Sequence, residues 1–112
     1  MGSFFKYIIL FSLTMVGAQS LDERYHTYDE IIELLDSLSN VESYQGWFLV
    51  DTIGYSNQEN IPILAVKISD NAHIKEDEPR ALFVGQVHAE EILGIEVVLD
   101  FMMDLLDPRP ED

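Results

Sequence analysis

The chain has 112 residues, which is enough for one small domain at most. It carries 21 Asp and Glu against 6 Lys and Arg, a formal net charge of −15 at pH 7, and this acidity argues against nucleic acid and anionic membrane surfaces as partners because both need basic patches. Cysteine is absent, which excludes disulfides, thiolate zinc sites and cysteine nucleophiles and leaves His, Asp and Glu as the plausible metal ligands.

The first twenty residues have the outline of a secretory signal peptide. Lys6 precedes an uncharged run over residues 7–15, and small residues follow that run. Cleavage after Ala18 or after Ser20 satisfies the requirement for small residues about equally well, so both sites stay open. A membrane anchor is the alternative, but an apolar run of about a dozen residues is short against the roughly 20 that span a bilayer. We therefore expect residues 1–20 to be removed and the mature chain to be secreted or extracytoplasmic, without a stable membrane span.

The next expected element is a helix with a well-marked start. Thr27 and Glu30 have the spacing of a capping box, in which each side chain satisfies an otherwise unpaired amide near the helix N-terminus. We expect this helix to run from residue 28 to about residue 38 and to end at Ser39 and Asn40. Acidic residues occupy one face, and the other face carries an apolar stripe typical of a packing helix: Tyr28, Ile31, Ile32, Leu35 and Leu38.

Two strands are expected to follow as an antiparallel hairpin. Residues 46–53 are rich in aromatic and β-branched side chains and are broken by Gly54, and residues 61–68 form the second strand after a polar turn. Pro62 lies near the start of that strand, where a missing amide is tolerated. Residues 70–79 are charged and predict a surface loop.

A third strand and a long helix complete the expected order. Residues 81–84 are a short apolar run that ends at Gly85 and predicts a buried strand. The pattern becomes helical from Glu90 and continues to about residue 106, apolar around more than half of its circumference, so we expect this helix to be largely buried against a sheet. Gly94 costs roughly 1 kcal/mol relative to Ala within a helix, and close packing against the strand is the expected reason for it. The fold class is α/β.

The junction between this strand and this helix carries the residues with chemical potential. His88 and Glu91 are three residues apart, and side chains at this spacing on a helical turn have Cβ atoms about 5–6 Å apart. An imidazole nitrogen and a carboxylate oxygen can therefore reach one zinc ion at roughly 2.0–2.2 Å. The alternative from spacing alone is a histidine packed in the core and a glutamate that the helix macrodipole stabilises.

Four segments in order are similar to the start of zinc carboxypeptidases of the carboxypeptidase A type. The resemblance covers nearly all of the mature chain, and it implies the N-terminal part of a mixed-sheet zinc-carboxypeptidase-like fold in a secreted metallocarboxypeptidase. It further implies Zn²⁺ as cofactor, His88 and Glu91 as the first two zinc ligands, and peptide or protein C-termini as substrates. The four segments are residues 25–30, 52–56, 63–69 and 83–91.

The chain departs from this family at two places. The best-known branch has arginine after the alanine of the ligand motif, where it helps to hold the substrate, and this chain has Glu90. An acidic side chain beside the metal disfavours an anionic peptide terminus at short range. The turn before the second strand is also irregular, because Asn60 and Ile61 stand where the family usually has glycine and arginine.

The resemblance places the third zinc ligand, a histidine, and the glutamate that serves as general base downstream of these residues. We considered His26 and His73 as substitutes for the third ligand and expect both to be plain surface residues. Residues 21–112 are therefore expected to be the truncated N-terminal part of a carboxypeptidase domain, inactive by itself and with one face and one edge of its sheet uncovered. Gln86 and Glu90 are the side chains expected to support the ligands or face the substrate.

Two other functions share parts of the pattern. A related zinc acylase would use the same ligand pair, but glycine and asparagine are expected between its ligands, and Ala89 and Glu90 favour the peptidase. A non-catalytic domain that keeps the fold and binds peptides or a partner protein is the third possibility. A histidine after a later strand and a strand-borne glutamate would distinguish the enzyme from the binding domain.

Overall fold

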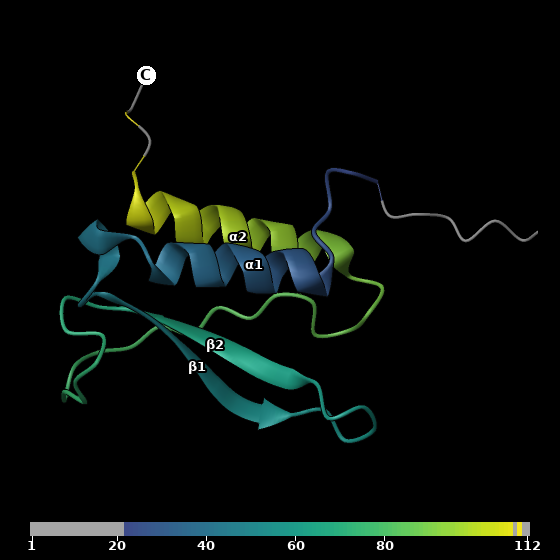
Figure 1. Ribbon diagram of the computed structural model, residues 1–112, viewed down its shortest axis with the longest axis horizontal. Coiled ribbons are helices and arrows are strands. Elements are labelled where there is room, and N and C mark those ends of the chain that lie inside the picture. The colour runs from purple at the N-terminus through teal and green to yellow at the C-terminus, as the bar shows by residue number, and fades with distance from the viewer. Residues whose placement is uncertain (1–21, 109, 111–112) are drawn as a thin grey trace, which may run out of the picture.

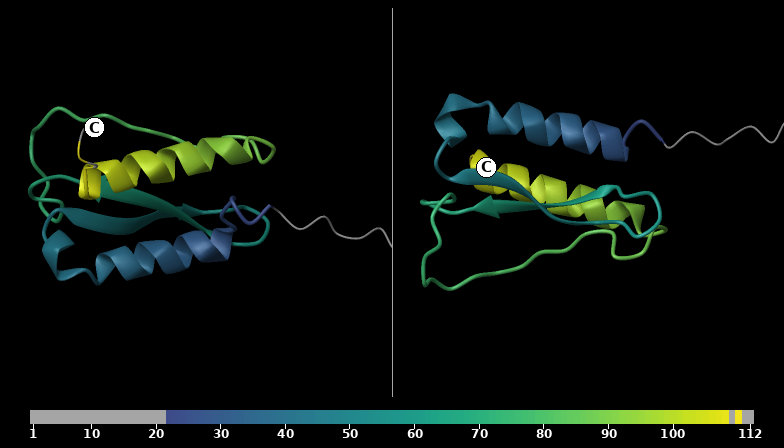
Figure 2. Two further views of the ribbon diagram at one scale, coloured as in Figure 1. Left: turned by 90° about the horizontal axis from the view of Figure 1, so that it is seen from above. Right: turned by 60° about the horizontal axis from the view of Figure 1, so that its bottom comes forward.

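The computed structural model describes residues 22–108 and 110, so the expected signal peptide lies outside the described residues. The elements in chain order are α1 (Tyr28–Ser39), the 3₁₀ turn η1 (Glu42–Tyr44), β1 (Phe48–Tyr55), β2 (Pro62–Ile68) and α2 (Ile92–Leu106). Both helices lie on the same side of the β1–β2 hairpin in Figure 1, and the views in Figure 2 agree. The described residues thus form an α/β arrangement in which a layer of helices covers one face of a two-stranded sheet.

Helix α1 confirms the expected cap. The Thr27 amide donates to Glu30 Oε2 at 2.7 Å and the Glu30 amide donates to Thr27 Oγ1 at 3.4 Å, which completes the capping box. The helix ends at Ser39, and the amide of its C-cap, Asn40, donates back to the carbonyl groups of Ser37 and Leu38. The capping box therefore fixes the N-terminal end of this helix, and a backbone amide closes its C-terminal end.

Strands β1 and β2 confirm the antiparallel hairpin, with different bounds. β1 begins at Phe48, because Gly46 adopts a positive φ of 105° and belongs to the turn before it. The expectation that Gly54 breaks the strand is wrong. Pairing continues to Tyr55, and the ladder absorbs an irregularity between Thr52 and Gly54 as a bulge.

The core lies between the helices and the hairpin. Partly buried side chains from both strands, including Val50, Leu64 and Val66, pack against it. Removing each large side chain from water stabilises the fold by about 1.5–3 kcal/mol. The buried members of this core are Leu35, Leu38, Phe48, Leu99, Met102 and Leu106.

The third expected strand is not formed among the described residues. Residues 80–84 pair with no strand, and Leu82, Phe83 and Val84 are 87%, 57% and 63% exposed. The physical reason is that a strand exists only through a hydrogen-bonded neighbour, and the sheet in the described part of the chain consists of β1 and β2 alone. The Phe83 ring instead packs on Phe101 of α2, with ring centroids 4.6 Å apart.

Helix α2 is less buried than its composition predicts. It begins at Ile92, two residues later than Glu90, with Glu91 as its N-cap, and it ends at Leu106 as expected. One side enters the core, whereas a second apolar stripe stays in solvent: Leu93, Val97, Phe101 and Leu105, which are 62%, 60%, 38% and 45% exposed. None of the helices in the described ranges is long and apolar enough to cross a bilayer.

Candidate metal centre

A tight turn delivers His88 and Glu91 to the start of α2. Gln86 has a positive φ of 53°, and its side-chain Nε2 donates to the Ala89 carbonyl at 3.2 Å. The Glu91 amide donates to the His88 carbonyl at 3.0 Å, and the Gly94 amide donates to the Glu91 carbonyl at 2.9 Å. These successive bonds turn the backbone into α2 and place both candidate ligands on the same side of the turn.

The two side chains meet at their polar ends. His88 Nδ1 lies 2.9 Å from Glu91 Oε1, and the His88 amide donates to Glu91 Oε2 at 3.4 Å. Two tetrahedral ligands that each lie about 2.0–2.2 Å from one zinc ion are themselves roughly 3.3–3.6 Å apart, so the 2.9 Å separation is that of a direct hydrogen bond, and the pair would open by about half an ångström to share a metal ion. The side chains are 67% and 52% exposed, which leaves room for further ligands. The residues present thus fit two positions of a zinc site.

The supporting residues expected from the sequence, Gln86 and Glu90, occupy different positions relative to this pair. The Gln86 side chain is bonded to the Ala89 backbone, so it braces the turn between the ligands. Glu90 is exposed beside Glu91 and adds negative charge next to the candidate metal position. The Gln86 side chain is thus bonded to the turn backbone, and Glu90 is an exposed neighbour of the pair.

Neither histidine considered as a third ligand joins His88 and Glu91. His26 Nδ1 lies 2.8 Å from Glu96 Oε2 and the His26 amide donates to Glu96 Oε1 at 2.7 Å, so this side chain ties the residues before α1 to α2. His73 is exposed in the charged loop. Within residues 22–108 and 110, three metal-capable side chains gather elsewhere in the fold, and that group contains neither His88 nor Glu91.

That other group is an acidic cluster in the charged loop, formed by Asp70, Glu76 and Glu78. Their carboxylate oxygens lie within 4.8 Å of one another. Lys67 Nζ lies 3.9 Å from Glu78 Oε1 and donates to the Ile74 carbonyl, so a cation of the chain itself already faces the cluster. The charged composition of this stretch predicts only a surface loop, and spacing alone gives no signal that the loop folds these carboxylates together.

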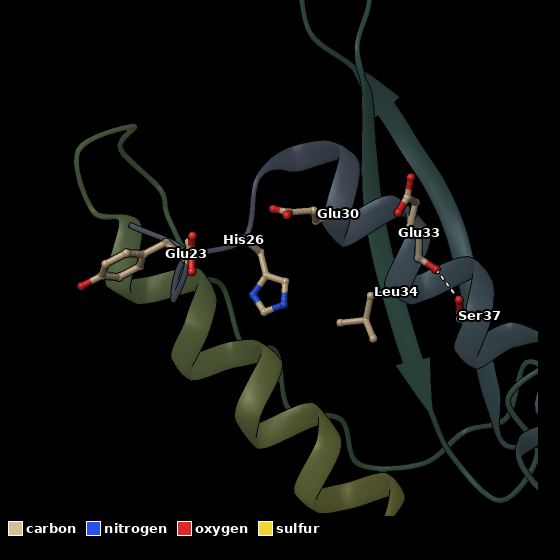
Figure 3. A pocket seen from close by; sticks show the side chains of 7 residues that line it. Glu23, His26, Glu30, Glu33, Leu34 and Ser37 are labelled. Carbon is tan, nitrogen blue, oxygen red and sulfur yellow. Dashed lines mark hydrogen bonds between the residues drawn. The ribbon is translucent and has the colours of Figure 1, made fainter. Parts of the chain in front are cut away.

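An acidic hollow of about 340 Å³ lies at the start of α1. Figure 3 shows His26 between the two helices and Glu30 and Glu33 along α1. The Thr27 amide and hydroxyl hold the pKa of Glu30 below its ordinary value, because both donate to the ionised carboxylate. This hollow is separate from the His88–Glu91 pair, and its lining consists of Glu23, Tyr25, His26, Glu30, Glu33, Leu34 and Ser37.

Comparison with known proteins adds two matches that include the candidate pair. The zinc carboxypeptidase family model, peptidase M14, matches residues 31–111, which is more than half of the chain. A protein named zinc carboxypeptidase from Saccharothrix mutabilis subsp. capreolus is 29% identical over 98 residues, and the match covers 87% of this chain and 22% of that protein. The chain thus spans about a fifth of the length of this relative. No solved structure matches.

Proposed function

The chain belongs to the zinc carboxypeptidase family, and on that premise we propose that it supplies the first two zinc ligands, His88 and Glu91, of a metallocarboxypeptidase. The proposed reaction releases C-terminal residues from peptides. The observation that carries the proposal is the convergence of His88 Nδ1 and Glu91 Oε1, 2.9 Å apart, inside the stretch that the family model matches.

In this proposal residues 1–20 are a signal peptide and residues 21–112 are the N-terminal part of a larger carboxypeptidase domain. Two facts support the proposal that residues 21–112 belong to a larger domain. The match covers most of this chain and only 22% of its relative. The apolar segment 81–84 also has the composition of a strand that is buried on both faces, although it is exposed among the described residues. Secretion follows from the signal peptide and belongs to the same proposal.

The chain's own residues contribute binding and orientation. When bound, zinc supplies Lewis-acid activation of the scissile carbonyl and of a water molecule. His88 would hold the ion through a ring nitrogen, which must be free of its proton to do so. Glu91 would contribute a carboxylate oxygen from the N-cap position of α2. Glu90 would repel an anionic peptide terminus at short range, which predicts that this side of the site does not hold the substrate carboxylate.

The third ligand and the general base are assigned to the part of the domain beyond this match. Catalytic zinc normally takes three protein ligands and water, so a two-ligand site binds weakly. We accordingly propose that the chain alone is inactive as a peptidase. Metal binding is the property of the site that can be measured in this chain.

The experiment is a zinc titration of the full chain by isothermal calorimetry. His88→Ala should abolish the binding event, because it removes one of two ligands, whereas His73→Ala should leave it unchanged. Glu78→Gln controls for zinc at the acidic cluster of Asp70, Glu76 and Glu78. Equal binding by the His88→Ala and His73→Ala variants would eliminate the proposed site.

A non-catalytic peptide-binding or partner-binding domain is the second candidate. The observation that favours it is Glu90, an exposed acidic side chain beside the candidate pair that disfavours an anionic peptide terminus at short range. The two candidates separate in a longer protein that contains this chain. Zinc-dependent release of C-terminal residues supports the enzyme, and binding of peptides without release supports the domain.

A further inference from the structure

Both candidate ligands lie in a loop whose ends touch through two glycines. Gly85 precedes His88 by three residues and Gly94 follows Glu91 by three. A Cβ atom added to Gly94 would lie 3.0 Å from the Gln86 nitrogen and 3.8 Å from the Gly85 Cα. A Cβ atom added to Gly85 would lie 2.6 Å from the Gly94 carbonyl oxygen. The chain therefore returns onto itself backbone against backbone, with the ligands between the two points of contact.

Space, rather than backbone conformation, explains these two glycines. Among the described glycines only Gly46 has a positive φ, so neither Gly85 nor Gly94 is needed for a left-handed conformation. Gly94 lies in the first turn of α2, where glycine costs roughly 1 kcal/mol relative to alanine. Glycine at this position allows the close approach of the Gly85–Gln86 backbone, which explains why it is present despite this cost.

We propose that Gly85 and Gly94 are positioning residues for the metal pair: their backbone contact fixes both ends of the loop and thereby the separation of His88 Nδ1 and Glu91 Oε1. This inference rests on the proposed function and adds residues to it that touch neither metal nor substrate.

The magnitudes show why the contact matters to a metal site. Ordinary contacts between non-bonded atoms lie at about 3.5–4.0 Å. A methyl group at Gly85, 2.6 Å from the Gly94 oxygen and 3.0 Å from Val98 Cγ2, must therefore push the loop away from α2 by roughly 1 Å. Metal–ligand distances tolerate only about 0.2 Å. A loop shift of roughly 1 Å, which the rest of the fold can accommodate, is therefore large against the tolerance of the two metal-binding atoms.

The test compares zinc affinity in the full chain carrying Gly85→Ala, Gly94→Ala or the control Gly54→Ala. A Cβ at Gly54 would have Ile63 Cδ1 at 4.0 Å as its nearest neighbour, an ordinary contact, so the control introduces the same methyl group without crowding. We expect Gly85→Ala and Gly94→Ala to weaken zinc binding by about tenfold or more, the range found for residues that orient ligands. Gly54→Ala should leave the affinity unchanged. Unchanged affinity in both loop variants would overturn the proposal.

A second measurement separates positioning from general loss of structure and does not need the metal. The ring ¹⁵N shifts of His88 report its contact with Glu91 in the metal-free chain, and they should move in Gly85→Ala and Gly94→Ala while amide exchange in α1 and the hairpin stays unchanged. If the chain without substitutions binds no zinc through His88, the proposed function fails and these shifts alone decide the inference. Ring shifts that stay constant, or that move only with a loss of protection in α1, would overturn it.

A double variant identifies which contact acts. Gly85→Ala with Val98→Ala removes the side-chain crowding at 3.0 Å but keeps the 2.6 Å conflict with the Gly94 carbonyl. We expect the double variant to bind zinc as weakly as Gly85→Ala. Recovery of the affinity would show that Val98, and not the backbone contact, sets the loop, and would overturn the proposal.

Discussion

The core between the helices and the hairpin differs sharply from the ligand-bearing part of the molecule. In the core, Leu35 and Phe48 are 5% and 4% exposed. In residues 80–91, which carry the candidate ligands, Leu82 is 87% exposed and Val87 is 69% exposed, although both are as apolar as the core residues. The two helices and the hairpin bury the core residues. Residues 80–91 include side chains as apolar as those of the core, but these side chains stay exposed. The candidate ligands therefore come together in a segment that is not buried.

The largest effect of this difference should appear in global unfolding. We expect residues 21–112, expressed without the proposed signal peptide, to lose structure gradually on heating, because a large share of their apolar surface stays in water before and after unfolding. Circular dichroism and calorimetry measure this. A sharp transition with matching calorimetric and van't Hoff enthalpies would show that the exposed segment is covered in solution.

The next largest effect is a substitution in the closed region. Phe48→Ala removes a side chain that is 4% exposed from the centre of the core and should cost about 3–5 kcal/mol. Amide hydrogen exchange measures this cost as a lower opening free energy in β1, β2 and α1, without requiring a cooperative transition. Protection that survives in α1 would indicate that the helix does not depend on the hairpin.

The bond between His26 and Glu96 joins the closed region to the start of α2. Glu96→Ala removes the acceptor for both the His26 amide and its ring. Because the His26 side chain is 42% exposed, solvent weakens this contact, and we expect a loss of about 1 kcal/mol in stability. Amide exchange should rise at residues 22–26 and in the first turn of α2. His73→Ala is the matched control, because it removes an exposed histidine outside this contact. Equal exchange in both variants would contradict a role for the bond.

Sequence could predict the elements that depend on near neighbours. Thr27 and Glu30 define the helix start within four residues, and the hairpin strands are joined by a short polar turn. The contact between His88 and Glu91 was also within reach, since only two residues separate them. The unpaired state of residues 81–84 was not, because strand formation depends on a neighbour that apolar composition does not identify.

The same limit applies to contacts between distant positions. His26 and Glu96 are separated by 70 positions, and no local pattern joins them. The contact between Gly85 and Gly94 was expected only as close packing against a strand, and the structure shows it as packing against a turn. Sequence therefore identifies the candidate ligands, whereas the contacts between distant residues around them require the fold.

A smaller effect concerns acid sensitivity at the cap of α1. The pKa of Glu30 is lowered in the folded chain by the Thr27 amide and hydroxyl, so its charge stabilises the helix start at any pH above the ordinary glutamate pKa of about 4.3. This contribution is lost as the pH falls through the lowered folded value, because the protonated carboxyl accepts those bonds poorly. Helix signal and amide exchange between pH 6 and pH 3 should show this loss in residues 27–30 toward the acid end of the range. Glu30→Ala should remove that part of the pH dependence, and an unchanged profile would contradict the assignment.

The smallest expected effect is that of a substitution at an exposed apolar position, which can be compared directly with the substitution in the core. Leu82→Ser exchanges a large apolar side chain for a polar one at a position that is 87% exposed, so stability should change by less than about 0.5 kcal/mol. Binding of a hydrophobic dye should fall, because the substitution removes part of an exposed apolar surface. The contrast with Phe48→Ala is then one of environment, since both substitutions remove large apolar side chains. If Leu82→Ser instead lowers amide protection in α2 as Phe48→Ala does, residues 81–84 are packed in solution, and the segment before the ligands is held by contacts that the isolated chain provides itself.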